Sequence, residues 1–122
     1  MANGGHPPAF VLRADGGVEQ LEGGGRLLGI AADCPIHRQS VWLSAGDSIV
    51  LYTDGITEAR PKGRGRLFEE SGIAATLGKV AHDADADTIA GAVADAAYDY
   101  ADGHAADDSG VVVIRIVEPR PL

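Results

Sequence analysis

The sequence predicts an α+β fold in which two helices flank an antiparallel β-sheet. Short apolar runs separated by glycine-containing turns fill the first half of the chain, helical periodicity begins near Leu67, and a β-branched run comes last. Packing helices onto one sheet buries the apolar surface of both. With 122 residues, 45% of them hydrophobic, the chain has the size and composition of a single domain, residues 1–122.

The first predicted element is a β-hairpin. Residues 10–12, Phe-Val-Leu, form a β-prone run, and residues 18–21 form a second one. Asp15 and Gly16 stand between the two runs in a pattern typical of a tight turn. A glycine-rich corner follows, and residues 26–30 form a short strand or a bend.

A second hairpin, formed by residues 39–43 and 48–53, is the most clearly patterned one in the chain. Gly46 and Asp47 lie between its strands, and we interpret them as turn residues. Residues 49–52 are apolar without alternation, so we expect both faces of this strand to be covered. The pattern therefore predicts a central strand.

Two helices and a closing strand complete the fold. The first helix begins near Phe68, although Gly72 weakens its pattern. The second and stronger helix spans residues 88–101, with Asp87 as its predicted N-cap. Residues 111–117 are rich in valine and isoleucine and predict a strand.

Composition and charge exclude several classes of function. The net charge is −8, and the basic residues gather only around Lys62, Arg64 and Arg66, so we expect no nucleic-acid partner. The apolar runs are far shorter than the roughly 20 residues of a membrane-spanning helix, so we expect no membrane partner. Cys34 is the single cysteine and no leader pattern precedes the first prolines, which indicates a cytoplasmic protein.

Acidic residues at two strand ends are the candidate chemistry. Asp54 follows an apolar strand, with Gly55 behind it leaving room for an ion or its waters, and Asp107 and Asp108 precede the final strand. Mg²⁺ and Mn²⁺ prefer such oxygen ligands. The local pattern leaves an alternative open, because Asp-Gly after an apolar run is also a hairpin turn and Asp-Asp-Ser-Gly is also an ordinary loop. Glu58 is interpreted as a solvated loop charge.

Other catalytic groups find no support in the sequence. The four histidines lack metal-ligand spacing, and we interpret His82 and His104 as loop or helix-end residues. Cys34 has no nearby base, and no serine stands in a nucleophile-elbow pattern. Covalent catalysis therefore has no candidate.

Three segments together resemble the PPM-type protein phosphatases, in particular their bacterial SpoIIE-like branch. Residues 3–8, Asn-Gly-Gly-His-Pro-Pro, resemble that branch's Asn-Ala-Gly-His-Pro-Pro. Residues 46–59, Gly-Asp-Ser-Ile-Val-Leu-Tyr-Thr-Asp-Gly-Ile-Thr-Glu-Ala, are the most specific match. The third segment is the Asp107-Asp108 pair before the final strand, where Ser109 and Gly110 depart from the apolar residues usual in the family.

The resemblance implies a fold, a metal site and a reaction. It implies part of a β-sandwich in which two Mn²⁺ or Mg²⁺ ions lie between two sheets, and a metal-bound water attacks a phosphoserine or phosphothreonine. By position, Asp54 and Asp107 would be metal ligands and Asp108 a neighbouring or alternate ligand. The substrate implied is a phosphoprotein, for example an anti-sigma-factor antagonist in bacterial signalling.

The same resemblance implies that the N-terminal half of the family domain is absent from this chain. The family's first acidic motif, which bridges both metals, stands upstream of the segment that residues 3–8 resemble. We therefore expect weak metal binding and little or no turnover by this chain alone, and a possible homodimer through an exposed sheet edge. Two alternatives remain: a non-catalytic interaction module that keeps the fold, and a structural domain whose aspartates are turn residues.

Overall fold

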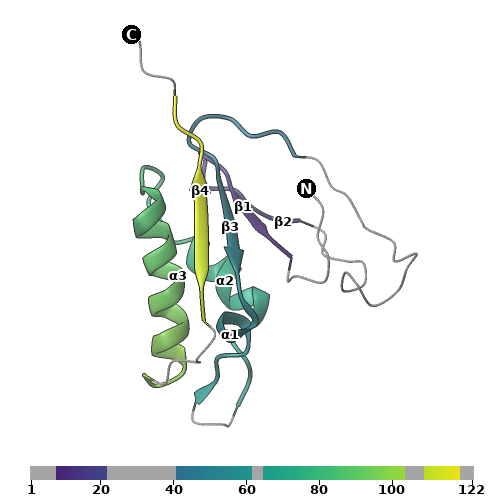
Figure 1. The fold of residues 1–122 in the computed structure, drawn as a ribbon, viewed down its shortest axis with the longest axis vertical. Coiled ribbons are helices and arrows are strands. Elements are labelled where there is room, and N and C mark those ends of the chain that lie inside the picture. Colours follow the sequence, from purple (N-terminus) through teal and green to yellow (C-terminus); the bar gives the residue numbers. More distant parts are fainter. Residues whose placement is uncertain (1–7, 22–40, 62–64, 104–108, 119–122) are drawn as a thin grey trace, which may run out of the picture.

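The fold is a four-stranded antiparallel sheet with three helices on one of its faces (Figure 1). It comes from a computed structural model that describes residues 8–21, 41–61, 65–103 and 109–118. The sheet order is β2-β1-β3-β4. The predicted α+β class is confirmed.

The first hairpin is confirmed. β1 (Phe10–Leu12) pairs with β2 (Val18–Gln20), and the Arg13 amide donates a hydrogen bond to the Gly17 carbonyl at 2.7 Å across the turn. Gly16 has φ +94°, a backbone conformation that suits glycine.

The central strand is also confirmed, but the second hairpin is wrong. β3 (Ser48–Tyr52) lies between β1 and β4 (Val111–Arg115) and pairs with both antiparallel. A strand has only two edges, so none is left for the preceding segment. Residues 41–44 instead form no strand, and Val41 and Leu43 pack on the sheet face that the helices leave open. Gln39 and Ser40 lie outside the described residues.

Both predicted helices form, and a third, very short helix precedes them in the chain. α1 (Asp54–Thr57) follows β3 directly, α2 (Glu69–Leu77) begins next to Phe68 as expected, and α3 (Ala86–Tyr100) is the longest. The predicted N-cap of α3 was two residues too late: Asp85 caps it, accepting a 2.8 Å hydrogen bond from the Thr88 amide. Asp87 lies in the first turn.

The helices cover one sheet face and leave the other open. The main core joins side chains of β1 and β3 to the buried face of each helix: Phe10, Leu12, Val50, Tyr52, Ile56, Ile73, Leu77, Ile89, Val93 and Ala97. Across the sheet, Val112 and Ile114 are 58% and 49% exposed, beside Leu51 and Ile49. In the described part of the chain, no helix is long and apolar enough to span a bilayer.

Candidate functional site

Asp54 lies where the buried central strand ends. It is exposed, it is the first residue of α1, and its backbone carbonyl accepts hydrogen bonds from the Glu58 amide and the Thr57 hydroxyl. The chain thus continues from Asp54 into a helical turn, and the hairpin-turn alternative for Asp54-Gly55 is wrong. From the described residues, the Asp54 carboxylate receives no hydrogen bond and no ion pair.

The end of β3 and the start of β4 are tied together. The Thr53 amide donates to the Gly110 carbonyl at 3.0 Å, and the Gly110 amide donates back to the Thr53 hydroxyl at 2.9 Å. One step further along the ladder, Tyr52 pairs with Val111. Ser109 and Gly110, the two residues that depart from the family pattern, therefore form the approach to β4, and Gly110 directly flanks the residue before Asp54.

A third distant segment joins the same end of the sheet. The Tyr52 hydroxyl donates a hydrogen bond to the carbonyl of Pro8, the last residue of the first motif. Burial raises the pKa of this hydroxyl above its ordinary value, and the negative charges of Glu70 and Asp54 act in the same direction. Pro8 of the first motif and Gly110, which follows the Asp107-Asp108 pair, therefore both contact the second motif at Tyr52 and Thr53.

The predicted ligand set is described only in part. Asp107 and Asp108 lie outside the described residues, so their part in a metal site remains a prediction. Within the described ranges, no three His, Cys, Asp or Glu side chains gather closely enough to hold a metal ion. Of the three predicted ligands, the structure thus gives the position of Asp54.

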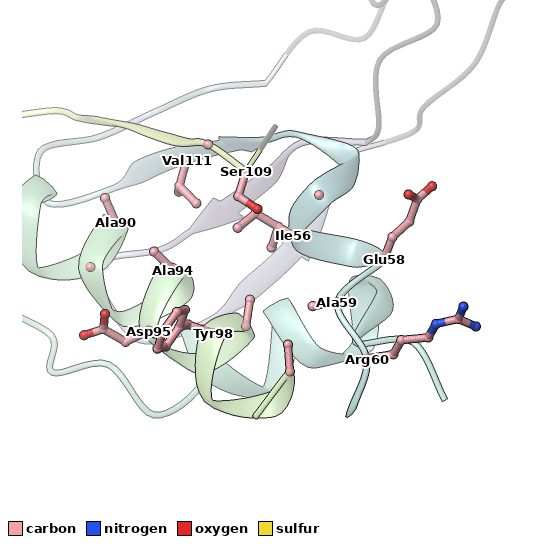
Figure 2. A pocket seen from close by; sticks show the side chains of 15 residues that line it. Ile56, Glu58, Ala59, Arg60, Ala90, Ala94, Asp95, Tyr98, Ser109 and Val111 are labelled. Atoms are coloured by element: carbon pink, nitrogen blue, oxygen red, sulfur yellow. The ribbon is translucent and has the colours of Figure 1, made fainter. Parts of the chain in front are cut away.

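A cavity of about 630 Å³ opens beside α1, between that helix, α3 and the start of β4. Figure 2 shows Ile56 and Val111 on one side of it and Ala94 and Tyr98 of α3 on the other. Glu58 and Arg60 extend away from it at its outer edge (Figure 2). Sequence patterns did not predict this cavity. The one signal for it is a row of small residues at positions 90, 91, 94 and 97 of α3 and at position 101, which caps the helix.

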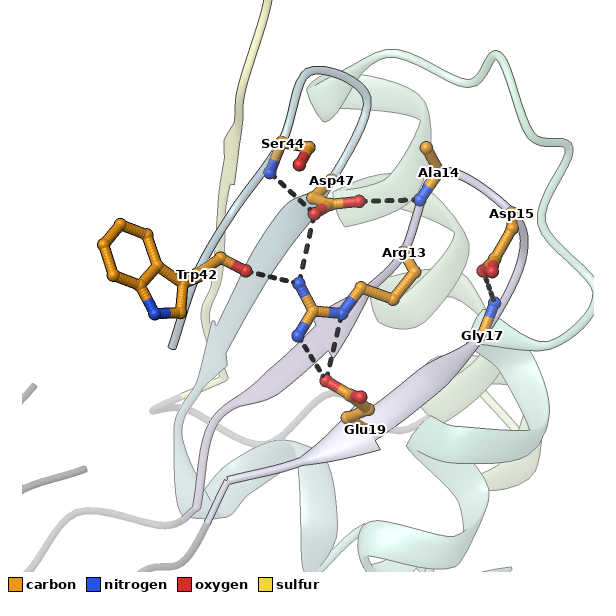
Figure 3. A network of polar contacts seen from close by, with 8 residues as sticks. All are labelled: Arg13, Ala14, Asp15, Gly17, Glu19, Trp42, Ser44 and Asp47. Carbon is orange, nitrogen blue, oxygen red and sulfur yellow. Dashed lines mark hydrogen bonds and ion pairs between the residues drawn. The ribbon is translucent and has the colours of Figure 1, made fainter. Parts of the chain in front are cut away.

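At the opposite end of β3, the buried Asp47 is the centre of a polar network that joins two loops (Figure 3). The Asp47 carboxylate accepts hydrogen bonds from the Ser44 and Ala14 amides, both at 2.8 Å, and from the Arg13 guanidinium at 3.1 Å. These contacts, with that from the Ser44 amide the largest, hold the pKa of the Asp47 carboxyl below its usual range. Arg13 also binds Glu19 at 2.6 Å. Asp47 was interpreted as a turn residue, but the structure gives it a larger role as a clamp between two loops.

Of the remaining candidates, only His82 falls within the described residues. His82 is exposed in the connection between α2 and α3, as its loop interpretation predicted. Cys34 and His104 lie outside the described residues.

Comparison with known proteins identifies the family. The family model for stage II sporulation protein E (SpoIIE) matches residues 1–117. The chain is 40% identical over 60 residues to the phosphoserine phosphatase RsbU of Bacillus subtilis and 33% identical over 72 residues to the protein IcfG of Synechocystis. These matches cover 48% and 55% of this chain, but only 18% and 11% of the two relatives.

The fold has close neighbours among solved structures. The phosphatase domain of SpoIIE from Bacillus subtilis, presoaked with Mn, matches with a TM-score of 0.71 and 25% sequence identity. The match covers 96% of this chain and 49% of that one. The chain thus spans about half of that phosphatase domain. Because the family model covers residues 1–117 and the fold matches a solved SpoIIE phosphatase domain, the chain belongs to the SpoIIE family of PP2C-type protein phosphatases.

Proposed function

We propose that this chain is the C-terminal half of a metal-dependent protein serine/threonine phosphatase domain. The pairing of Thr53 with Gly110 carries the proposal, because it brings the segment containing Asp54 next to the segment that follows Asp107 and Asp108. Asp107 is three residues from Gly110, and three residues of chain span at most about 10 Å. Carboxylates from both segments can therefore reach a shared cation.

The donor set fits a hard divalent cation. The Asp54 carboxylate is exposed at the end of a rigid strand, and Gly55 presents no side chain beside it. Asp54 and Asp107 would hold Mn²⁺ or Mg²⁺, with Asp108 as a neighbouring or alternate ligand. When bound, such ions supply a nucleophilic water at neutral pH and neutralise the charge that builds on the phosphoryl oxygens.

The substrate we propose is a phosphoserine or phosphothreonine protein. Support comes from RsbU, which is named a phosphoserine phosphatase and shares 40% identity over the matched segment. An anti-sigma-factor antagonist is the specific phosphoprotein that the family resemblance favours. The protein would act in the cytoplasm.

The isolated chain should be impaired. It spans about half of the matched phosphatase domain, and Val112 and Ile114 leave the β4 end of the sheet face opposite the helices apolar and exposed. We propose that a second sheet covers this face in the complete domain.

Without that second sheet, two copies of the chain would associate through the same face or through the β4 edge. Ile114→Lys should then shift the mass measured by light scattering from dimer to monomer. A monomeric wild-type chain at high concentration would argue against this association.

Titration calorimetry with Mn²⁺ tests the metal site. We expect weak saturable binding by the wild-type chain, loss of binding in Asp54→Asn, and no change in Asp83→Asn. Asp83 is an exposed aspartate in the connection between α2 and α3, so its substitution removes the same charge elsewhere. Binding that survives Asp54→Asn would refute the proposed ligand.

The alternative is a non-catalytic interaction module that retains the fold. It predicts no Mn²⁺ binding and no hydrolysis of phosphoserine peptides even when the chain is joined to the rest of its domain. Hydrolysis that depends on Mn²⁺ and on Asp54 would eliminate it.

A further inference from the structure

The cavity beside α1 adjoins the proposed catalytic edge. Gly55, the residue after Asp54, lines it together with Ser109 and Gly110. A phosphorylated residue placed at the Asp54 carboxylate would therefore have its neighbours in the peptide chain within reach of the cavity mouth.

The interior of the cavity suits an apolar side chain. Its walls are mainly Ile56, Ala90, Ala94, Ala97 and Val111, and its volume of about 630 Å³ is much larger than one aliphatic side chain requires. A leucine side chain would gain from such a site, because burying it removes apolar surface from water.

Gly91 of α3 leaves open space in the wall of the cavity. A methyl group added at Gly91 would meet no atom within 4 Å, so the space beside it is open. Glycine inside a helix costs stability relative to alanine, and α3 carries it on the cavity side.

The acidic charge at the cavity edge favours a basic residue next to the apolar residue of the peptide. Among the residues that the structure describes, Glu58 and Asp95 stand at the cavity edge with one cation, Arg60, and the chain as a whole has a net charge of −8. Lysine or arginine beside the apolar residue would complement this rim.

We propose that this cavity is the specificity pocket of the phosphatase and takes one apolar side chain, flanked by a basic residue, from the substrate segment near the phosphorylated serine or threonine. The inference rests on the proposed phosphatase function. It assigns the choice of substrate to α3, which contributes no predicted ligand, and to the part of α1 that follows Asp54.

Phosphoserine peptides test the pocket. The probes are Gly/Ser nonapeptides in which one leucine, with lysine next to it, moves through the positions on either side of the phosphoserine. The enzyme is the complete phosphatase domain that contains this chain, supplied with Mn²⁺. We expect one register to raise kcat/KM roughly 10-fold over the peptide without leucine.

Gly91→Leu places a leucine side chain in the cavity, where it would compete with the substrate leucine. It should bring the ratio of kcat/KM with leucine to kcat/KM without leucine close to one. The control Ala75→Leu adds a similar side chain at an exposed position of α2, and it should leave the ratio unchanged. Both kcat/KM values are measured on one enzyme preparation. The fraction of folded enzyme therefore cancels from their ratio.

The other outcomes separate the two proposals. Turnover without a leucine preference, or a preference that survives Gly91→Leu, overturns the pocket and leaves the phosphatase function standing. Loss of all turnover in Gly91→Leu, with Ala75→Leu active, shows that the protein's own remaining half fills the cavity, and it overturns the pocket as well. No turnover of any peptide by the wild-type domain overturns the proposed function, and the pocket with it.

Discussion

Thr53 and Gly110 are joined by two hydrogen bonds, one in each direction, although 57 positions separate them in the sequence. The Thr53 amide and the Gly110 carbonyl extend the β3–β4 ladder, whereas the Thr53 hydroxyl accepts from the Gly110 amide. A side chain thus fixes the backbone at the place where the segment containing Asp54 meets the start of β4.

Thr53→Val should loosen this connection. Valine keeps the shape but cannot accept the Gly110 hydrogen bond, so we expect a loss of about 1 kcal/mol in unfolding free energy and weaker Mn²⁺ binding by calorimetry. The control is Thr76→Val, which removes a hydroxyl bonded to the Gly72 carbonyl within α2. It should leave Mn²⁺ binding unchanged. Equal metal affinity in both variants would contradict a role for Thr53 in shaping the site.

Asp47→Asn should lower stability most at neutral pH. The pKa of the Asp47 carboxyl is lower in the folded protein than its unfolded value of about 3.9, so the charged form stabilises the fold above about pH 4. This contribution disappears as pH falls through the folded pKa. We expect urea unfolding to show a deficit of about 1–3 kcal/mol at pH 7 that shrinks below about pH 4.

Asp83→Asn is the charge-matched control for Asp47, because it removes one negative charge from an exposed position. Its unfolding free energy should stay within about 0.5 kcal/mol of wild type at every pH. A deficit in Asp47→Asn that stayed constant down to pH 2 would show that the carboxylate charge does not contribute.

Asp85→Ala should destabilise α3 more than Asp87→Ala. Asp85 accepts the Thr88 amide at the helix start, and hydrogen bonds from the Thr88 side chain and amide hold the pKa of the Asp85 carboxyl below its usual range. Asp87 favours the helix only through its charge in the first turn. Thermal unfolding followed by circular dichroism should give the lower Tm for Asp85→Ala. The reverse order would support the N-cap predicted from sequence.

Gly72→Ala and Gly91→Ala should have opposite effects, although both lie inside helices. A methyl group at Gly72 would lie 2.6 Å from the Phe68 ring, so we expect a loss of about 1–3 kcal/mol. At Gly91 the space is open, and alanine should add about 0.5–1 kcal/mol through helix propensity. Urea unfolding measures both, and stabilisation by Gly72→Ala would mean that the ring moves aside freely.

Local patterns predicted the elements whose pairing is also local. The β1–β2 hairpin has its turn residues in sequence between its strands, and the buried face of α3 follows from spacing alone. The motif at residues 46–59 and the position of Asp54 at a strand exit were likewise readable without a structure.

Elements that depend on distant partners were predicted less well. The hairpin expected before β3 fails because β1 and β4 occupy both edges of that strand. Gly72 looked like a weakness in a helix, whereas the Phe68 ring needs the space that a side chain would fill. Asp87 was predicted as the N-cap of α3 where the structure has Asp85, because either aspartate satisfies the residue preference for that position.

The sequence by itself determined the class of fold, the family motifs and the identity of the acidic residues, since each depends on residue type and spacing. Tertiary structure decided which distant segments meet: Pro8 with Tyr52, Thr53 with Gly110, and α1 with α3 around a cavity. The physical reason is that sheet pairing and side-chain packing join residues by their positions in space. A local sequence pattern does not specify which distant strand will pair with each edge.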